Sequence, residues 1–380
     1  MKFQYHFEPH KGWMNDPNGL CCYKGQYHAF FQYNPYAPVW DSMHWGHAVS
    51  ENLVTWKQVE TALIPEEAYE NAGGCFSGSA IEKEDMLYLF YTAVSKEYGQ
   101  AQATASSSDG IHFVKNADNP IIPFLPGHKA GETNQDFRDP KVFEAFGRYY
   151  MVCGSCQGQE GQILLYSSED LEHWRFENIL YRNSEFGGTL ECPDLFRLAD
   201  KWVLMFSAMK PKVASTVFAI GQFDGTNFHV ERTVYSEYGI DFYAPQTFSD
   251  FNNRRIMIGW FYHWNKPLPQ GAEAAGALSI PRELALADGV ISNYPVKEAR
   301  HLLVKECKYV KTNGTLLTIC DFDGNTIYEK DFYDVNGIKS FESVEVASDK
   351  KVKGVDEIRL RLSEYSFLVN IFFRKCHSLV

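Results

Sequence analysis

The sequence has no paired cysteine framework, no long apolar run and no excess of basic charge. Its nine cysteines are an odd number at irregular spacings, which does not suit a disulfide scaffold. No apolar run reaches the roughly 20 residues of a membrane-spanning helix, and the N-terminal residues lack the apolar stretch of a signal peptide. A net charge of −12 argues against nucleic-acid and anionic-membrane partners, which need basic surface. We therefore expect a cytoplasmic protein with reduced thiols.

Helical periodicity and metal-binding spacings are scarce as well. A (β/α)8 barrel would need eight helical segments, and the sequence contains essentially none. Cys153 and Cys156 have the spacing of half a zinc site, but no second pair or suitable histidines follow. We interpret them as strand residues and expect no metal there.

What the sequence does contain is aromatic residues and a repeat. Four turn segments close on an aromatic residue, at Trp56, Phe113, Trp174 and Phe228. Five hairpin-like segments, such as "YKGQYHAFFQY" and "EKEDMLYLFYTAV", start near residues 23, 82, 144, 197 and 250. Five units of about 50–60 residues, each with several short strands, predict an all-β fold, a five-bladed β-propeller. We assign residues 1–295 to the propeller and residues 296–380 to a short, apparently incomplete C-terminal β-sandwich.

One polar position precedes each hairpin segment at a steady spacing. These positions are Asp16, Ser77, Asp139, Glu191 and Tyr243. We expect each of these residues to lie on the first strand of its blade. If that strand is innermost, the five side chains meet at one end of the central channel. Prolines nearby also fit strand-initiating turns, and "DPNG" alone fits a type I turn. Turns do not explain three carboxylates at this position, because clustered acids repel one another.

Clustered carboxylates suit two kinds of chemistry. Two facing carboxyl groups are the apparatus of glycosidic bond cleavage, one as nucleophile or base and one as acid. A calcium or magnesium site is the main alternative, although such sites usually gather ligands within one loop or add waters and carbonyls. Acids from three separate blades favour the glycosidase.

Nine ordered motifs resemble glycoside hydrolase family 32: "WMNDPNG", "FQYNP", "MHWGHA", "FSGS", "FRDPKV", "ECPDLF", "DFYAPQ", "IGW" and "LSIPREL". The resemblance covers about residues 3–285 and implies a β-fructofuranosidase of the invertase type. It implies retaining double displacement through a fructosyl-enzyme intermediate, with no metal or organic cofactor. The "PVWDSMHWGHA" region looks more like bacterial sucrose and sucrose-6-phosphate hydrolases than like fructan hydrolases.

The resemblance also implies roles for individual residues. Asp16 would be the nucleophile, Glu191 the acid and then the base, and Asp139 a hydrogen-bond acceptor for fructose hydroxyls. Arg138 would stabilise the ionised form of Asp139. The other residues expected to line the fructose subsite are Asn15, Gln32, Trp40, Phe76, Ser77, Tyr243 and Trp260.

Several alternatives stay open at this point. The substrate could be sucrose, sucrose 6-phosphate or a short fructan, and the acceptor could be a second sugar instead of water. An inverting furanosidase that cleaves arabinan or xylan and a non-catalytic sugar-binding propeller are more remote alternatives. The short C-terminal part departs from the family pattern, and an exposed edge there would favour a homodimer.

Overall fold

The computed structural model describes the propeller region almost completely. Side chains and backbone are described for residues 6–209, 215–236, 242–261, 264, 268, 271–287 and 289–299. Backbone alone is described for 300–302, 307–313, 316–321, 326–331, 358–361 and 368–371. The statements below concern these residues.

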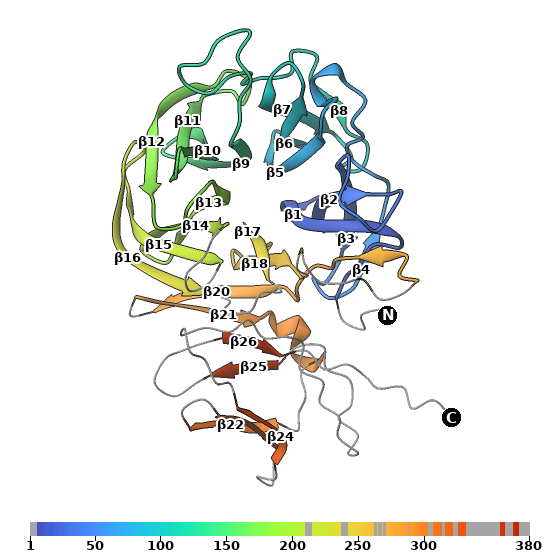
Figure 1. Ribbon diagram of the computed structural model, residues 1–380, viewed down its shortest axis with the longest axis vertical. Coiled ribbons are helices and arrows are strands. Elements are labelled where there is room, and N and C mark those ends of the chain that lie inside the picture. The colour runs from blue at the N-terminus through green and yellow to red at the C-terminus, as the bar shows by residue number, and fades with distance from the viewer. Residues whose placement is uncertain are drawn as a thin grey trace.

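Five antiparallel sheets are arranged around a common axis as the blades of a propeller (Figure 1). Blade I contains β1 (Gly12–Tyr23), β2 (Gln26–Asn34), β3 (His44–Ser50) and β4 (Trp56–Gln58), with β19 (Ala274–Ala275) added beside β1. Blade II contains β5 (Gly74–Lys83), β6 (Met86–Ser95), β7 (Gly99–Ser107) and β8 (Val114–Lys115). Blade III contains β9 (Phe137–Ala145), β10 (Arg148–Gln157), β11 (Glu160–Ser168) and β12 (Arg175–Asn183).

The remaining strands complete the ring and continue beyond it. Blade IV contains β13 (Leu190–Leu198), β14 (Lys201–Ala208), β15 (Thr216–Phe223) and β16 (Phe228–Ser236). Blade V contains β17 (Tyr243–Ser249), β18 (Arg255–Trp260), β20 (Arg282–Ala287) and β21 (Val290–Pro295). The strands that follow are β22 (Cys307–Asn313), β23 (Leu316–Asp321), β24 (Thr326–Asp331), β25 (Ile358–Arg361) and β26 (Leu368–Ile371). The five-bladed propeller expected from the sequence is thus confirmed.

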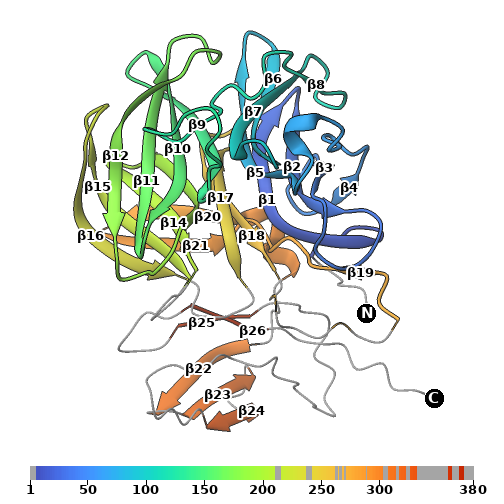
Figure 2. The ribbon, with the colours of Figure 1, turned by 45° about the horizontal axis from the view of Figure 1, so that its top comes forward.

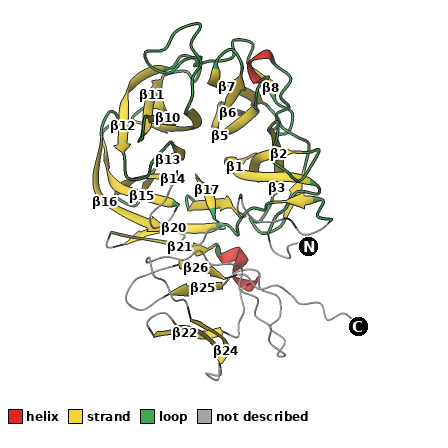
Figure 3. Ribbon diagram, in the orientation of Figure 1, coloured by secondary structure: helices red, strands yellow, loops and turns green. Residues whose placement is uncertain are grey.

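Helix is almost absent from the described residues, as the sequence predicted. Two short 3₁₀ segments, η1 (Ala68–Glu70) and η2 (Lys297–Leu302), are the helical elements in Figure 3. In the described part of the chain, no helix has the length and apolar character needed to cross a bilayer. β22–β24 form a three-stranded sheet and β25–β26 a hairpin; the rest of the expected C-terminal sandwich lies outside the described residues.

The core lies between the blades, which explains why a single unit could not fold alone. Phe30 of blade I packs in one apolar cluster with Leu89 of blade II, and Leu165 of blade III packs in another with Leu204 of blade IV. Three further apolar clusters join blade I with V, II with III, and IV with V. The turn residues Trp56 and Trp174 pack against the first two of these clusters. Each blade therefore depends on two neighbours for burial of its apolar faces.

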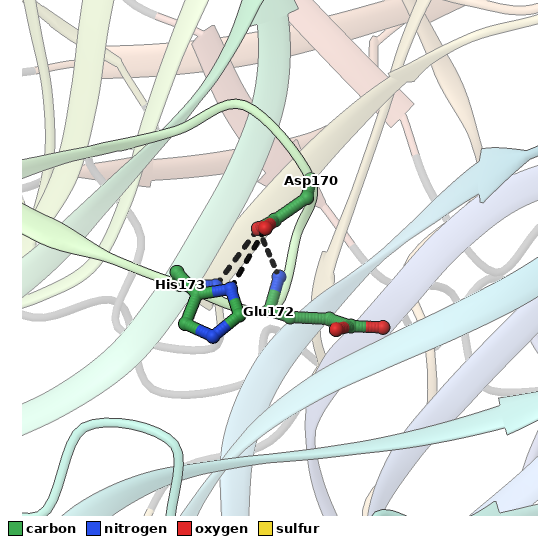
Figure 4. Close-up of side chains that lie close together, drawn as sticks. All are labelled: Asp170, Glu172 and His173. Atoms are coloured by element: carbon green, nitrogen blue, oxygen red, sulfur yellow. Dashed lines mark hydrogen bonds and ion pairs between the residues drawn. The ribbon is translucent and has the colours of Figure 1, made fainter.

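The repeated turn segments owe their shared sequence to backbone hydrogen bonding. In the turn before β12, Asp170 Oδ1 accepts bonds from the backbone N–H groups of Glu172 and His173 at 2.9 and 2.8 Å (Figure 4). Asp109 and Asp224 accept equivalent pairs of bonds in the turns before β8 and β16. A side-chain acceptor that closes the turn on its own backbone is the reason for Asp or Asn at this position.

Every innermost strand carries a β-bulge next to its polar residue. β1, β5, β9, β13 and β17 contact one another in a ring around the axis, and Figure 2 shows β1, β5, β9 and β17 side by side. Their pairing with the second strand of the blade shifts register beside Asp16, Ser77, Asp139, Glu191 and Tyr243. A bulge redirects side chains and tolerates proline, because the ladder hydrogen bond is already interrupted.

The local interpretation of "DPNG" as a type I turn is therefore wrong. Asp16 and Pro17 lie within β1, and Pro17 occupies the irregular stretch of its pairing with β2. The proline that suggested a turn instead marks the bulge.

Candidate active site

Three carboxylates from three blades gather near the start of their strands. Asp16 lies on β1, Asp139 on β9 and Glu191 on β13. Cys192 connects them, because its Sγ lies 3.6 Å from Asp16 Oδ2 and its backbone N–H donates to Asp139 Oδ2 at 2.8 Å. The residue that follows Glu191 thus touches both aspartates, and the structure brings all three acids to one end of the channel.

Asp16 receives a hydrogen bond on each carboxylate oxygen. Asn15 Nδ2 donates to Oδ1 at 3.0 Å, and Ser77 Oγ donates to Oδ2 at 2.8 Å. Burial, together with the charge of Glu191, raises the pKa of Asp16, while these hydrogen bonds oppose the rise. The arrangement keeps a carboxylate available in a desolvated site.

Asp139 is buried in a backbone conformation that few residues adopt. Its φ is 63°, and its backbone N–H donates to Thr92 Oγ1 at 3.0 Å. Burial raises the pKa of Asp139 to about 7; Arg138 opposes the rise, and Glu191 and Asp16 add to it. Strain and desolvation concentrated on one acid are typical of functional sites.

Glu191 is held on both oxygens by neighbours from other blades. Arg138 donates to Oε1 from Nε at 3.2 Å and from Nη2 at 2.9 Å. Tyr243, at the start of β17, donates its hydroxyl to Oε2 at 2.5 Å. Arg138 lowers the pKa of Asp139 through its charge, which favours the ionised form of Asp139, and its shorter hydrogen bonds go to Glu191 and to Asp136.

The remaining expected subsite residues divide into a polar group and an aromatic group. Gln32 is buried and donates from Nε2 to the backbone oxygen of Cys75, the residue before Phe76, at 2.9 Å. Trp40 is 44% exposed and meets Phe76 edge to face, with ring centroids 5.8 Å apart. Trp260 is fully buried, and its ring centroid lies 5.8 Å from that of Trp13.

Several residues of this neighbourhood were missed by the sequence analysis. Asp136 bonds Arg138 Nη1 at 3.0 Å and accepts the hydroxyl of Thr189 at 2.7 Å. Trp264 stacks on Trp13 with ring centroids 5.4 Å apart. Cys192 belongs to the "ECPDLF" motif, but a cysteine side chain does not by itself predict contacts with two aspartates. The repeat spacing identified the polar residue on the innermost strand of each blade, but it did not identify the residues that contact these side chains.

Metal-ligating groupings are few among the described side chains. One grouping of suitable ligand atoms, Asp170, Glu172 and His173, lies on the surface, and Figure 4 shows Asp170 already bonded within its turn. The turn accounts for this cluster. Cys153 and Cys156 are free and lie in β10, so the half zinc spacing belongs to a strand as expected.

Comparison with known proteins identifies one family. A family model described as "Glycosyl hydrolases family 32 N-terminal domain" matches residues 6–295. A sucrose-6-phosphate hydrolase of Zymomonas mobilis is 36% identical over 330 residues, covering 80% of this chain and 63% of that protein. A levanase of Bacillus subtilis is 39% identical over 333 residues, covering 78% and 47%. The chain spans less than two thirds of the length of these curated relatives.

Solved structures give the same result. A Bombyx mori GH32 beta-fructofuranosidase in complex with sucrose superposes with a TM-score of 0.72 at 35% identity, covering 83% of this chain and 69% of that one. A sucrose-6-phosphate hydrolase from Lactobacillus gasseri superposes with a TM-score of 0.73 at 26% identity, covering 83% and 68%. The likeness therefore extends across the whole propeller.

Proposed function

The chain belongs to glycosyl hydrolase family 32, and from that premise we propose that it hydrolyses the β-fructofuranosyl bond of sucrose or sucrose 6-phosphate. The observation that carries the proposal is the meeting of Asp16, Asp139 and Glu191 around Cys192. Two carboxyl groups on either side of a glycosidic bond can supply a nucleophile and an acid without a cofactor.

In the first step, the Asp16 carboxylate attacks C2 of the fructose ring. The bond from C2 to the glucose oxygen breaks, and Glu191 gives its proton to that oxygen, so the products are glucose and a fructosyl ester of Asp16. Asn15 and Ser77 hold the attacking carboxylate through hydrogen bonds at 3.0 and 2.8 Å. A positioned, desolvated nucleophile needs little reorganisation to react.

In the second step, Glu191 takes a proton from water, and the resulting hydroxide attacks C2. The ester bond breaks, and fructose leaves with the configuration retained. Arg138 and Tyr243 orient Glu191 in both steps. Asp139 accepts hydrogen bonds from fructose hydroxyls, with Asn15, Gln32, Trp40, Phe76, Ser77, Tyr243 and Trp260 completing the subsite.

Variants of the two reacting acids test this assignment. We expect Asp16→Asn and Glu191→Gln to lose roughly a thousandfold or more in sucrose cleavage, with Asp170→Asn, a turn carboxylate, as the matched control. Glu191→Gln should lose far less with a nitrophenyl fructoside, because that leaving group needs little protonation. Unchanged sucrose hydrolysis in either variant would reject the roles.

The substrate and the stereochemistry need separate measurements. The similarity to a levanase, at 39% identity, favours fructan as the second candidate substrate. Rates with sucrose, sucrose 6-phosphate and inulin would rank the candidates, and added sucrose as acceptor would reveal fructosyl transfer. Nuclear magnetic resonance of the fructose first released reports retention; an inverted anomer would favour the inverting furanosidase mechanism.

We further propose that residues 1–295 contain the complete catalytic machinery. All the residues assigned above lie within this range. The cytoplasmic location and the homodimer expected from the sequence stay predictions; sedimentation of the purified chain tests the second.

A further inference from the structure

A second cavity opens on the same channel, further along the innermost strands than the three acids. Its volume is about 360 Å³, and all five innermost strands contribute to its lining, including Cys21, Glu82, Val142, Asp194 and Phe248. This volume is within the range of about 300–1,000 Å³ that small-molecule sites occupy. The cavity is separate from the residues assigned to catalysis, since none of them lines it.

One carboxylate of this cavity is only half satisfied. Asp194 is fully buried, and its Oδ2 accepts from the backbone N–H and the hydroxyl of Thr247 at 2.7 and 2.9 Å, with Lys141 Nζ 3.2 Å away. Its Oδ1 accepts no hydrogen bond from any described residue, although it is buried as well. A buried acceptor without a donor destabilises the folded state.

Arg255, on the same lining, has a buried donor without an acceptor. Arg255 lies over the ring of Phe196 at 4.9 Å, and Nη1 makes a long contact of 3.4 Å with Thr247 Oγ1. Its Nε is buried and donates to no described group, and no described carboxylate pairs with it within 4.0 Å. Two residues of the lining thus contain a buried acceptor and a buried donor that are not bonded to each other.

The charges and rings around these two groups indicate the class of ligand. Three acids and three bases line the cavity: Glu82, Glu144, Asp194, Lys141, Arg197 and Arg255. The lining also includes four large aromatic side chains: Phe143, Phe196, Trp202 and Phe248. A balanced lining does not select an ion, whereas a hydroxyl group can donate to a carboxylate and accept from a guanidinium at once.

We propose that this cavity is a second, non-catalytic site for a small uncharged sugar or polyol. Ligand hydroxyls contact Asp194 and Arg255, and the aromatic side chains cover the apolar face of the ligand. A metal cation is disfavoured, because Lys141 Nζ already occupies the backbone oxygen of Thr247 at 2.6 Å and neighbours Asp194. An anion gains little from Arg255, because three carboxylates line the same cavity.

The site is connected to the catalytic acids through two strands. Lys141 follows Asp139 by two residues on β9, and Asp194 follows Glu191 by three residues on β13.

The binding test is nevertheless independent of sucrose cleavage. Asp16→Asn serves as the background in the full chain, and D-glucose, glycerol and inorganic phosphate serve as probes in ligand-observed nuclear magnetic resonance and calorimetric titration.

Two variants remove the site in different ways. Arg255→Met keeps the bulk of the side chain and removes its donors, and Ser249→Trp fills the cavity from an exposed lining position. We expect at least a tenfold weaker cavity-bound glucose signal in both, with Arg182→Met, a surface arginine outside the cavity, as the control. Circular dichroism and the urea midpoint establish that each variant is folded; if Arg255→Met is not, Ser249→Trp decides.

Three outcomes would overturn the proposal. Glucose and glycerol could fail to bind at millimolar concentration, glycerol binding could survive in Ser249→Trp, or phosphate could bind the cavity in preference to glycerol. Sucrose hydrolysis by the unmodified chain is measured separately, so a failure of the catalytic assignment gives a different result from a failure of this one.

Discussion

The hydroxyl of Ser77 is one of three side-chain donors that favour the ionised form of Asp16. Ser77 donates to Asp16 Oδ2 at 2.8 Å, and this bond lowers a pKa that burial raises. Because the attacking group must be ionised, activity is lost as the pH falls through the pKa of Asp16. Residues that bond only to Asp16 therefore shape the acidic side of the pH profile.

Ser77→Ala should move the acidic limb of kcat/KM to higher pH. A hydrogen bond to a charged group contributes about 1.5–3 kcal/mol, which corresponds to a shift of about one pH unit or more and a loss of at least about tenfold in rate below the limb. Ser292→Ala, a surface serine, is the control. A lower rate with an unmoved limb would show that Ser77 acts on the substrate and not on Asp16.

Asp139 should cost the protein stability at neutral pH. Its pKa is about 7 in the folded chain against an ordinary 3.8. Between these values the folded state holds a proton that the unfolded state has released, so stability falls as the pH rises from about 4 to about 7. The full cost is on the order of 4 kcal/mol.

Asp139→Asn should therefore stabilise the fold while weakening catalysis. Asparagine tolerates a positive φ and can still accept the Cys192 N–H. We expect the urea midpoint of the variant to exceed that of the unmodified chain at pH 7, with the difference vanishing below pH 4. Equal gains at both pH values would assign the effect to packing and not to charge.

Much of the site at the level of single residues was predictable because it repeats once per blade. The spacing of Asp16, Asp139 and Glu191 follows from the strand count of each blade. The partner of Arg138 was not predictable, because a side chain that crosses from one blade to the next depends on the distance between strands far apart in sequence. Asp136 lies only two residues before Arg138, but its bond with Thr189 joins segments 53 residues apart and was equally unpredictable.

At the level of elements, the bulges of the innermost strands link sequence to chemistry. Prolines at positions 17, 140, 193 and 245 mark four of the five bulges, and Gly78 lies at the fifth. The sequence revealed the prolines and the hairpins. It did not distinguish a bulge from a turn, because both need a residue that gives up a ladder hydrogen bond, and only the pairing with the next strand separates them.

The hairpin between β5 and β6 offers a test of turn chemistry. Glu84 and Asp85 both have positive φ, at 52° and 61°, as a type I′ turn requires. The double variant Glu84→Asn, Asp85→Gly supplies the residues that such turns prefer, so we expect about 1 kcal/mol of stabilisation in urea unfolding and unchanged kcat for sucrose. A destabilised variant would mean that the side chains, not the backbone, hold this turn.

At the scale of the molecule, the ring closes through short contacts between the two ends of the propeller. β19 pairs in parallel with β1 at Gly12 and Trp13, and the backbone N–H of Leu278 donates to Phe7 at 2.8 Å. The sequence predicted five blades but not how the ring closes. The pairing of β1 with β19 covers only two residues of each strand, which is too short for a recognisable hydrophobic pattern. Residues after blade V contribute to the same seam, and they bear on where the propeller ends.

The final prediction concerns that boundary. Val296 and Ala299 are buried in the cluster shared by blades I and V, and Glu298 pairs with Arg254 at 3.0 Å. A chain that ends at Leu302 keeps these contacts, whereas a chain that ends at Pro295 loses the burial of one valine, about 1.5–3 kcal/mol, as well as the ion pair. We expect the longer version to retain sucrose cleavage and to unfold at a clearly higher urea concentration than the shorter one. Identical midpoints would place the end of the propeller at Pro295, and loss of activity in both would mean that the strands beyond residue 302 are needed to hold the blades together.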